Sequence, residues 1–226
     1  MIETFPTPAA LAEAATTAVH GALISAIDHR GGASLVATGG RSPAPIYDRL
    51  ARSRLDWGRV AVTLSDDRFT PATSADSNER LVREHLLTGA AAAAAARFVP
   101  LWRPADSPQA AADLAEADVA ALGSFDMLLL GMGEDGHVAS LIPGSPVLEA
   151  GMDPGGDRLL LGVPEGVGSP PVARITMTLP ALLRARATLI LISGAAKRAI
   201  VEDAAGLPVH ALLEQAKAPV RILWTM

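Results

Sequence analysis

The sequence contains no cysteine. This absence excludes disulfide bonds, thiolate catalysis and metal sites built on cysteine ligands. Basic charge is also scarce, because 19 lysines and arginines stand against 24 acidic residues and give a formal net charge of -5. A protein that binds nucleic acid without regard to sequence needs a broad basic surface, so the charge argues against that class. An anionic ligand must therefore be held by a few local cations.

Aromatic side chains are rare as well, at 4% of the residues, whereas apolar residues make up 50%. A core with so few rings must be built from alanine and aliphatic side chains packed between regular elements. A chain of 226 residues is long enough to bury such a core within one domain. The composition therefore favours one layered α/β domain.

The N-terminal stretch MIETFPTPAALAEA has acids and no basic region, which does not suit a signal peptide. Long apolar runs are missing too, since none approaches the length of about 18 residues that a membrane span requires. We therefore expect a cytoplasmic protein.

Short apolar runs alternate with helical patterns along the whole chain. Fully apolar runs separated by helices indicate parallel strands that are covered on both faces. Seven alanines at 90–96 are expected to form a short helix or a surface connection. The predicted strands are 34–38, 60–64, 98–102, 127–130, 159–163, 174–178, 188–192 and 220–224. One predicted helix begins at Pro8 and ends near Arg30. The other predicted helices lie near 43–53, 77–87, 107–122, 180–186, 195–204 and 208–216.

In open parallel sheets, ligands bind beyond the carboxyl ends of the strands. ATGGRSP (37–43) follows one such strand. Gly39 and Gly40 would let backbone amides approach an anion, Ser42 adds a hydroxyl, and Arg41 adds a bidentate donor for phosphate. Two glycines before a helix also make a plain turn, so this segment alone leaves both interpretations open.

A second polar segment, SDDRFTPATSADSNERL (65–81), follows the strand at 60–64. Asp66, Asp67 and Arg68 cluster where that strand ends. They are either part of a site or a solvated loop with an acid–arginine pair and a helix cap.

The third segment, GMGEDGHVASLIPG (131–144), follows the run MLLL. Its glycines relieve crowding at the strand end, and Asp135-Gly136 suits a turn with positive φ. His137 is the side chain best placed to take a proton at neutral pH, and Asp135 is near enough to orient its ring. A lone histidine is more often structural, but this position among glycines at a strand end favours a functional one.

Two further groups of residues need an interpretation. Lys197 opens a helix after the strand at 188–192, where it is either a phosphate ligand or a surface lysine. The remaining histidines are interpreted as structural or exposed: His20, His29, His85 and His210.

Taken in order, five segments resemble the 6-phosphogluconolactonases of the glucosamine-6-phosphate deaminase and isomerase superfamily. Asp67 stands where the family usually has glutamate, and Ile142 where many members have phenylalanine, so charge and apolar character are kept. The matching segments span residues 38–198 and are TGGRSP, SDDR with DSNERLVREHLL, FDMLLLGMGEDGHVASLIPG, ARITMTLP and SGAAKR.

The resemblance implies a three-layer α/β/α fold with an open, mostly parallel, Rossmann-like sheet, forming a single catalytic domain over residues 1–226. It implies hydrolysis of 6-phospho-D-glucono-1,5-lactone to 6-phosphogluconate in the oxidative pentose phosphate pathway. No cofactor or metal is expected. The expected partner is the phosphosugar lactone, with no nucleic acid and no membrane, for a monomer or weak homodimer.

The resemblance also implies roles for individual residues. His137 matches the general base that activates water, and Asp135 is expected to orient its ring. Arg68 would bind the phosphate or the oxyanion, with Asp66 holding sugar hydroxyls or fixing that arginine. Arg174 is expected to line the cleft. The residues expected to bind the phosphate are Gly39, Gly40, Arg41, Ser42 and Lys197.

Two other functions are alternatives to this one. A glucosamine-6-phosphate deaminase typically has GHIAFNEPG, in which an acid follows the histidine, but no acid lies between His137 and Glu149 here. A catalytically silent sugar-phosphate binding protein would be expected to lack the base or a phosphate ligand, yet His137, Arg68 and Lys197 are all present.

Overall fold

The fold is known from a computed structural model that describes residues 2–87, 93–203 and 206–226. Its centre is a seven-stranded sheet in the order β1-β10-β9-β6-β2-β3-β5, with every pair parallel. The strands are β1 (Ile2–Phe5), β2 (Ala33–Ala37), β3 (Val60–Leu64), β5 (Arg97–Phe98), β6 (Met127–Gly131), β9 (Thr188–Ser193) and β10 (Val220–Thr225).

A second, three-stranded sheet is antiparallel, in the order β4-β8-β7. Its strands are β4 (Asp66–Arg68), β7 (Leu160–Val163) and β8 (Arg174–Met177). The apolar runs at 159–163 and 174–178 are therefore strands, as predicted. Their antiparallel pairing could not be distinguished, because β8 is buried along its whole length and so has the apolar composition of a covered parallel strand.

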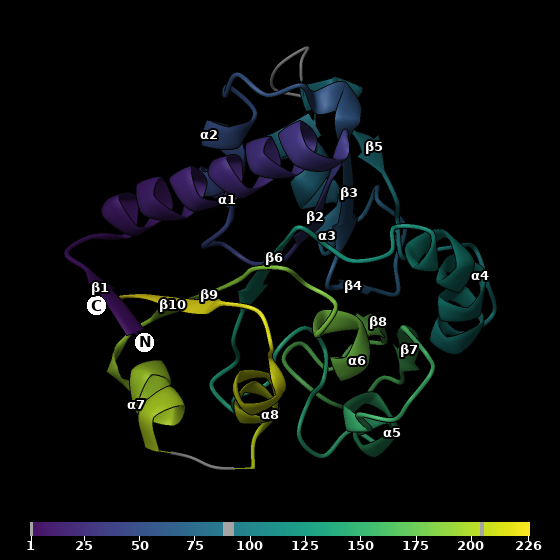
Figure 1. Ribbon diagram of the computed structural model, residues 1–226. Helices are drawn as coiled ribbons and strands as arrows, with labels where there is room; N and C mark the ends of the chain where they lie inside the picture. The colour runs from purple at the N-terminus through teal and green to yellow at the C-terminus, as the bar shows by residue number, and fades with distance from the viewer. Residues whose placement is uncertain (1, 88–92, 204–205) are drawn as a thin grey trace.

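Helices cover both faces of the main sheet, so the architecture is the predicted three-layer α/β/α arrangement. In Figure 1, α1 and α2 lie above the sheet, and α7 and α8 lie below it. The helices are α1 (Pro8–Arg30), α2 (Ala44–Leu50), α3 (Asn78–Val82), α4 (Pro108–Ala120), α5 (Leu148–Met152), α6 (Leu179–Leu182), α7 (Ala195–Asp203) and α8 (Pro208–Gln215).

Several local expectations need adjustment. The strand predicted at 98–102 is shorter, because Pro100 has no N–H with which to continue the ladder. The predicted helix at 77–87 consists of α3 followed by a π-helical turn over residues 83–87. In the alanine run, residues 90–92 lie outside the described residues, and Ala93–Ala95 form a 3₁₀ turn. The pattern missed β1, β4 and α5.

The ends of α1 follow from its sequence. The Thr7 hydroxyl accepts a hydrogen bond from the backbone N–H of Ala10 at 3.1 Å, and Pro8 occupies the first helical turn. The helix ends at Gly31, whose φ of 78° suits a residue without Cβ. Both ends agree with the prediction.

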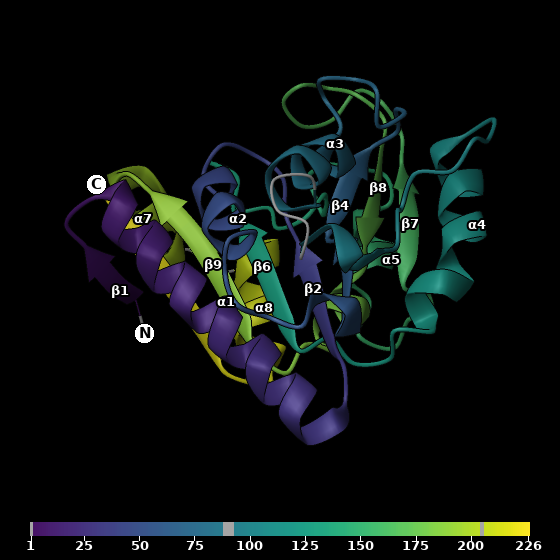
Figure 2. The same cartoon turned by 90° about the horizontal axis from the view of Figure 1, so that it is seen from above.

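By length and composition alone, α1 is apolar enough to cross a membrane, which the search for long apolar runs did not anticipate. Its packing accounts for this composition. The helix crosses the face of the main sheet (Figure 2) and contacts β2, β10 and α2. One stripe is buried there: Leu11, Ala12, Ala15, Val19, Leu23 and Ala26.

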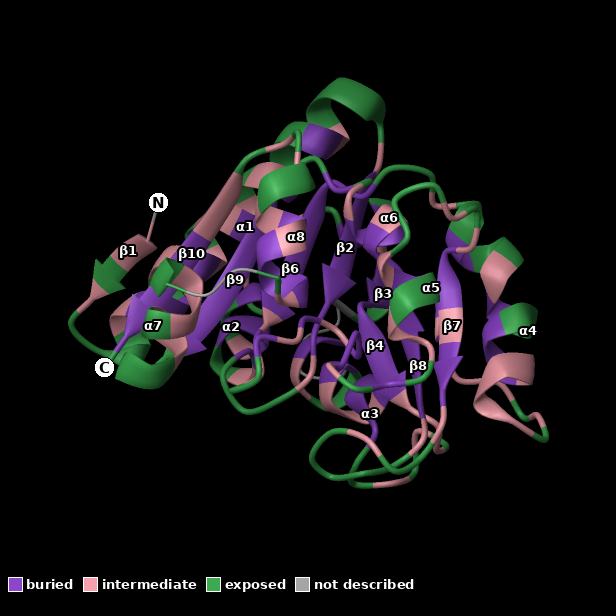
Figure 3. Cartoon of the chain, turned by 90° about the horizontal axis from the view of Figure 1, so that it is seen from below, coloured by how far each residue is buried: buried purple, intermediate pink, exposed green. Residues whose placement is uncertain are grey.

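The core lies between the layers, and Figure 3 shows that the strands of both sheets are largely buried. The antiparallel sheet packs closely on α4. A Cβ at Gly162 in β7 would overlap backbone atoms of Pro108 and Gln109, so only glycine permits this approach. α4 thus packs on β7 and β8 and covers the outer side of the small sheet.

We expect Gly162→Ala to lower the free energy of unfolding by about 1–3 kcal/mol or more, because backbone atoms cannot move aside as a flexible side chain can. Gly21→Ala is the matched control. Gly21 lies inside α1 with no atom near its missing Cβ, so alanine there should stabilise by roughly 0.5–1 kcal/mol. Urea unfolding of both variants measures this, and equal effects of the same sign would contradict the packing argument.

Candidate active site

A cleft of about 470 Å³ lies at the carboxyl edge of the main sheet. The segments that follow β2, β3, β6 and β9 converge there, because parallel strands end at the same edge. Every predicted site residue except Asp135 lines it. The lining is Thr38–Pro43, Asp66, Arg68, Asn78, Gly131–Gly133, His137, Ala139, Ser169, Arg174, Leu191, Ser193 and Lys197.

His137 and Asp135 are in direct contact at the end of β6. The ring Nδ1 lies 2.6 Å from Asp135 Oδ1, which also accepts the backbone N–H of His137 at 3.2 Å. Partial burial opposes ionisation, but the charge of His137 and its hydrogen bonds lower the pKa of Asp135 below its ordinary value. An ionised carboxylate only accepts, so Nδ1 carries a proton in either charge state of the ring, and in the neutral ring Nε2 keeps the lone pair. That nitrogen is suited to take a proton from water.

The glycines around this pair have separate functions. A Cβ at Gly133 would collide with the His137 ring and with the carboxylate of Asp135. Gly136 has a φ of 76°, which closes the turn between the two side chains. Crowding therefore requires glycine at 133 and turn geometry favours it at 136, whereas a Cβ at Gly131 would meet no atom within 4 Å, so the expected relief of crowding does not apply there.

Asp66 reaches the cleft from β4 and is held by two hydroxyl groups. Ser65 Oγ donates to its Oδ1 at 3.0 Å, and Ser140 Oγ donates to its Oδ2 at 2.6 Å. Ser140 is itself fixed, since its N–H donates to Thr176 Oγ1 at 3.0 Å. The sequence pattern gave no indication of this contact, although Ser140 lies three residues after His137 in the same motif.

Asp67 points away from the cleft and caps α3. Its carboxylate accepts the backbone N–H groups of Arg68, Asn78 and Glu79 at 2.8, 2.6 and 3.1 Å. Burial raises the pKa of Asp67 to about 7, while these hydrogen bonds act in the opposite direction. The segment is a strand with both aspartates buried, so it is not the solvated loop of the alternative interpretation. Asp67 accepts the first N–H groups of α3, while its two neighbours line the cleft.

Arg68 and Arg174 stand opposite one another on the paired strands β4 and β8. Arg68 donates to the carbonyl of Asp76 at 2.6 Å, and Arg174 donates to the carbonyl of Pro170 at 2.8 Å. The Nε atoms of both are buried and have no hydrogen-bond partner among the described residues. Burial, together with repulsion by Arg68, lowers the pKa of Arg174 despite the opposing effect of Asp66. Like charges placed opposite each other are destabilising, so this pair is suited to bind an anion.

A second cationic region lies where β2 and β9 end. Lys197, in the first turn of α7, donates to the carbonyl of Met132 and lines the cleft. Gly39 is packed so closely on Asn78 that a Cβ would overlap its amide, and Gly40 has a φ of 94°. The exposed Arg41 completes this region, which has the amides and charges to hold a phosphate.

The other four histidines lie away from this cleft, each with its own contact within the described chain. Their ring nitrogens contact Arg54 O, Ser25 O, Asp48 Oδ1 and Ile200 O, for His20, His29, His85 and His210 in turn. Across residues 2–87, 93–203 and 206–226, no group of three or more His, Cys, Asp or Glu side chains is arranged to hold a metal ion.

Comparison with known proteins identifies relatives over nearly the whole chain. Residues 6–224 match the family of glucosamine-6-phosphate isomerases/6-phosphogluconolactonase. The 6-phosphogluconolactonase of Caulobacter vibrioides is 46% identical over 225 residues, which cover 99% of this chain and 96% of that protein.

Solved structures agree with this relationship. The crystal structure of a 6-phosphogluconolactonase from Shewanella baltica superposes with a TM-score of 0.92 at 33% identity, covering 100% of this chain and 97% of that chain. A monomeric glucosamine-6-phosphate deaminase gives a TM-score of 0.79 at 18% identity, covering 99% and 96%. At 18% identity, the similarity to the deaminase shows only that the two proteins share a fold.

The lowered pKa of Asp135 predicts a pH-dependent contribution to stability. Its contacts stabilise the ionised form, so the contribution is complete above the ordinary carboxyl pKa of about 4 and is lost as the pH falls through the lower folded-state value. We expect Asp135→Asn to cost less than about 1 kcal/mol at neutral pH, because the pair is partly exposed. That cost should shrink as the pH falls below about 4.

Urea unfolding of wild type and Asp135→Asn across this pH range measures the difference. Glu134→Gln, which removes the same charge one residue away, is the control. A difference for Asp135→Asn that stays constant down to the acid end would contradict the ionic contribution.

Proposed function

The chain belongs to the glucosamine-6-phosphate isomerase/6-phosphogluconolactonase family, and on this basis we propose that His137 is the general base for hydrolysis of 6-phospho-D-glucono-1,5-lactone. Its activity is that of a 6-phosphogluconolactonase, a lactone hydrolase of the pentose phosphate pathway. The contact between His137 Nδ1 and Asp135 carries the assignment of the base, because it leaves Nε2 free to accept a proton.

The chemistry requires one proton acceptor and one site for developing negative charge. In the proposed step, His137 Nε2 takes a proton from water as the water oxygen bonds to C1 of the lactone, and the carbonyl oxygen becomes an oxyanion. Collapse of this intermediate breaks the bond between C1 and the ring oxygen. The imidazolium returns its proton to that oxygen, and the new carboxylic acid ionises to 6-phosphogluconate.

The product has two anionic groups, and the cleft has two cationic regions. We assign the phosphate to the glycine loop with Arg41, Ser42 and Lys197. Arg68 and Arg174 then stabilise the oxyanion and the carboxylate that replaces it, with Asp66 accepting from sugar hydroxyls. Anchoring the remote phosphate lets binding energy hold C1 beside the base.

The deaminase reaction is not favoured by this site. The segment after His137 brings Ala139 and Ser140 to the cleft and to Asp66, and no acid follows before Glu149. A protein that turned over glucosamine 6-phosphate but not the lactone would overturn the proposed function.

For the chain as a whole, we extend the proposal to a single catalytic domain over residues 1–226, acting as a monomer or weak homodimer in the cytoplasm. The indicated class is a soluble metabolic enzyme. Equilibrium sedimentation across a concentration series measures the state of association.

Loss of the base should abolish most of the turnover. We expect His137→Ala to reduce kcat by about two to four orders of magnitude with little change in KM. The assay generates the lactone in place with glucose-6-phosphate dehydrogenase, lets that step finish, and follows lactone decay against an enzyme-free reference. His29→Ala, an exposed histidine on α1, is the control, and near-normal turnover by His137→Ala would remove this residue from the mechanism.

Loss of a phosphate ligand should act on affinity instead. We expect Lys197→Ala and Arg41→Ala to raise KM chiefly, because each removes a charge that binds substrate and transition state alike. Steady-state kinetics on the phosphorylated lactone measures this. An unchanged KM in both variants would show that the phosphate lies elsewhere in the cleft.

A further inference from the structure

A second cavity of about 470 Å³ lies at the opposite edge of the main sheet, where the parallel strands begin. It is lined by the first residues of β2 and β3 and by the residue that opens β5. Four arginines border it, from different parts of the chain: Arg30, Arg59, Arg97 and Arg186. This concentration is unusual in a protein with a net charge of -5.

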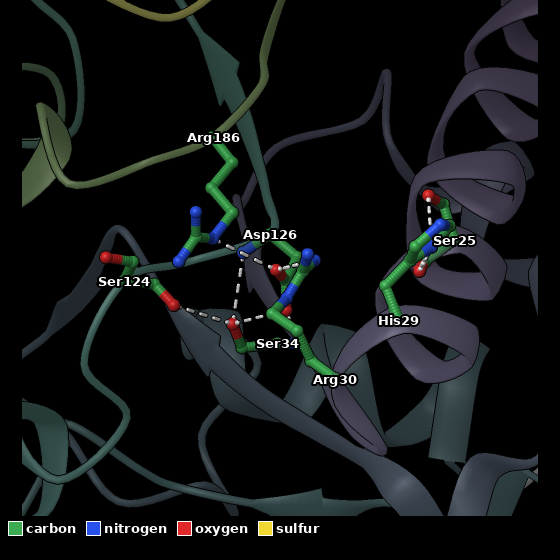
Figure 4. Close-up of polar contacts among 7 residues, drawn as sticks. All are labelled: Ser25, His29, Arg30, Ser34, Ser124, Asp126 and Arg186. Carbon is green, nitrogen blue, oxygen red and sulfur yellow. Dashed lines mark hydrogen bonds and ion pairs between the residues drawn. The ribbon is translucent and has the colours of Figure 1, made fainter.

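Two of the arginines are held in place by one buried carboxylate. Asp126 Oδ1 lies 2.6 Å from Arg30 Nη2 and 3.5 Å from Arg186 Nε. Its Oδ2 accepts the backbone N–H of Ser34 at 2.9 Å and the Ser34 hydroxyl at 3.3 Å. Figure 4 shows the two guanidinium groups converging on Asp126 from separate segments. Each therefore keeps most of its N–H donors free while its position is fixed.

The other two arginines add charge from the β3 side. Arg59 pairs with the exposed Asp56 at 3.0 Å, and Arg97 has no ion-pair partner within the described part of the chain. The C-terminal end of α1 borders the cavity, and its partial negative charge offsets part of the positive charge of Arg30. The C-terminal end of α4 also borders the cavity and has the same effect. Four guanidinium groups still face two carboxylates, which leaves an excess of positive charge.

From this arrangement we propose that the cavity is a second anion site, distinct from the catalytic cleft, which binds a small phosphorylated molecule. Guanidinium groups suit phosphate because each presents paired N–H donors. The volume lies in the range of small-molecule pockets rather than of extended protein interfaces. A phosphate dianion or a pyrophosphate group would balance the uncompensated charge.

The test uses inorganic pyrophosphate as the probe, titrated by calorimetry at low ionic strength. The wild-type protein should bind two pyrophosphates, one in the catalytic cleft and one at the arginine cavity. Arg41→Ala with Lys197→Ala should keep the site at the cavity. Arg59→Gln with Arg97→Gln should weaken that site by about tenfold or more, as expected for two charged hydrogen-bonding groups, while lactone hydrolysis stays unchanged.

Arg52→Gln with Arg184→Gln is the matched control. Both residues are exposed and lie outside the two cavities, and the two substitutions remove the same total charge. This control should bind two pyrophosphates like wild type. A single bound pyrophosphate that is lost in Arg41→Ala with Lys197→Ala, or equal weakening by the two arginine-to-glutamine double variants, would overturn the proposal.

A second measurement decides the question even if a variant fails to fold. Pyrophosphate added to the wild-type protein should shift the amide NMR signals of Gly32, Gly58 and Ser124, which line the cavity. Shifts confined to the glycine loop at residues 39–42 would show that only the catalytic cleft binds the probe.

Discussion

The parallel register of the main sheet is the constraint on which the candidate active-site cleft depends. Ala37 at the end of β2 pairs with Leu64 at the end of β3, and Gly131 at the end of β6 pairs with Leu191 of β9. This alignment brings four connecting segments to one edge, although they are distant in sequence. A shift by one residue would turn the side chains of a strand to the opposite face, so the register also fixes where each connecting segment begins.

Within the cleft at this edge of the sheet, the charged side chains differ in whether they have partners. Asp135 and Asp66 each have partners that hold the carboxylate in one position. The arginines Arg68 and Arg174 face each other with buried Nε atoms that lack partners. The protein thus maintains a like-charge pair that is suited to bind an anion, and arginines also outnumber carboxylates at the cavity on the other edge.

Much of the site could be predicted because it lies in short segments directly after apolar strands. The residues Gly39 to Ser42, Asp66, His137 and Lys197 all follow this rule, and they meet at one edge as expected. The antiparallel sheet could not be predicted, since composition does not reveal strand direction. The hydrogen bond from Ser140 to Asp66 could not be predicted either, because it joins residues 74 apart in sequence. The contact of Asp67 with the start of α3 was not predicted for that residue, because it depends on the path of the chain after β4.

The most direct test of the proposed mechanism is a crystal structure of the protein with 6-phosphogluconate bound. We expect the phosphate on the glycine loop and Lys197, and the C1 carboxylate between Arg68 and Arg174 within hydrogen-bond reach of His137 Nε2. A phosphate seated between the two arginines, with the carboxylate away from His137, would contradict both the assignment of the two cationic regions and the role of the base.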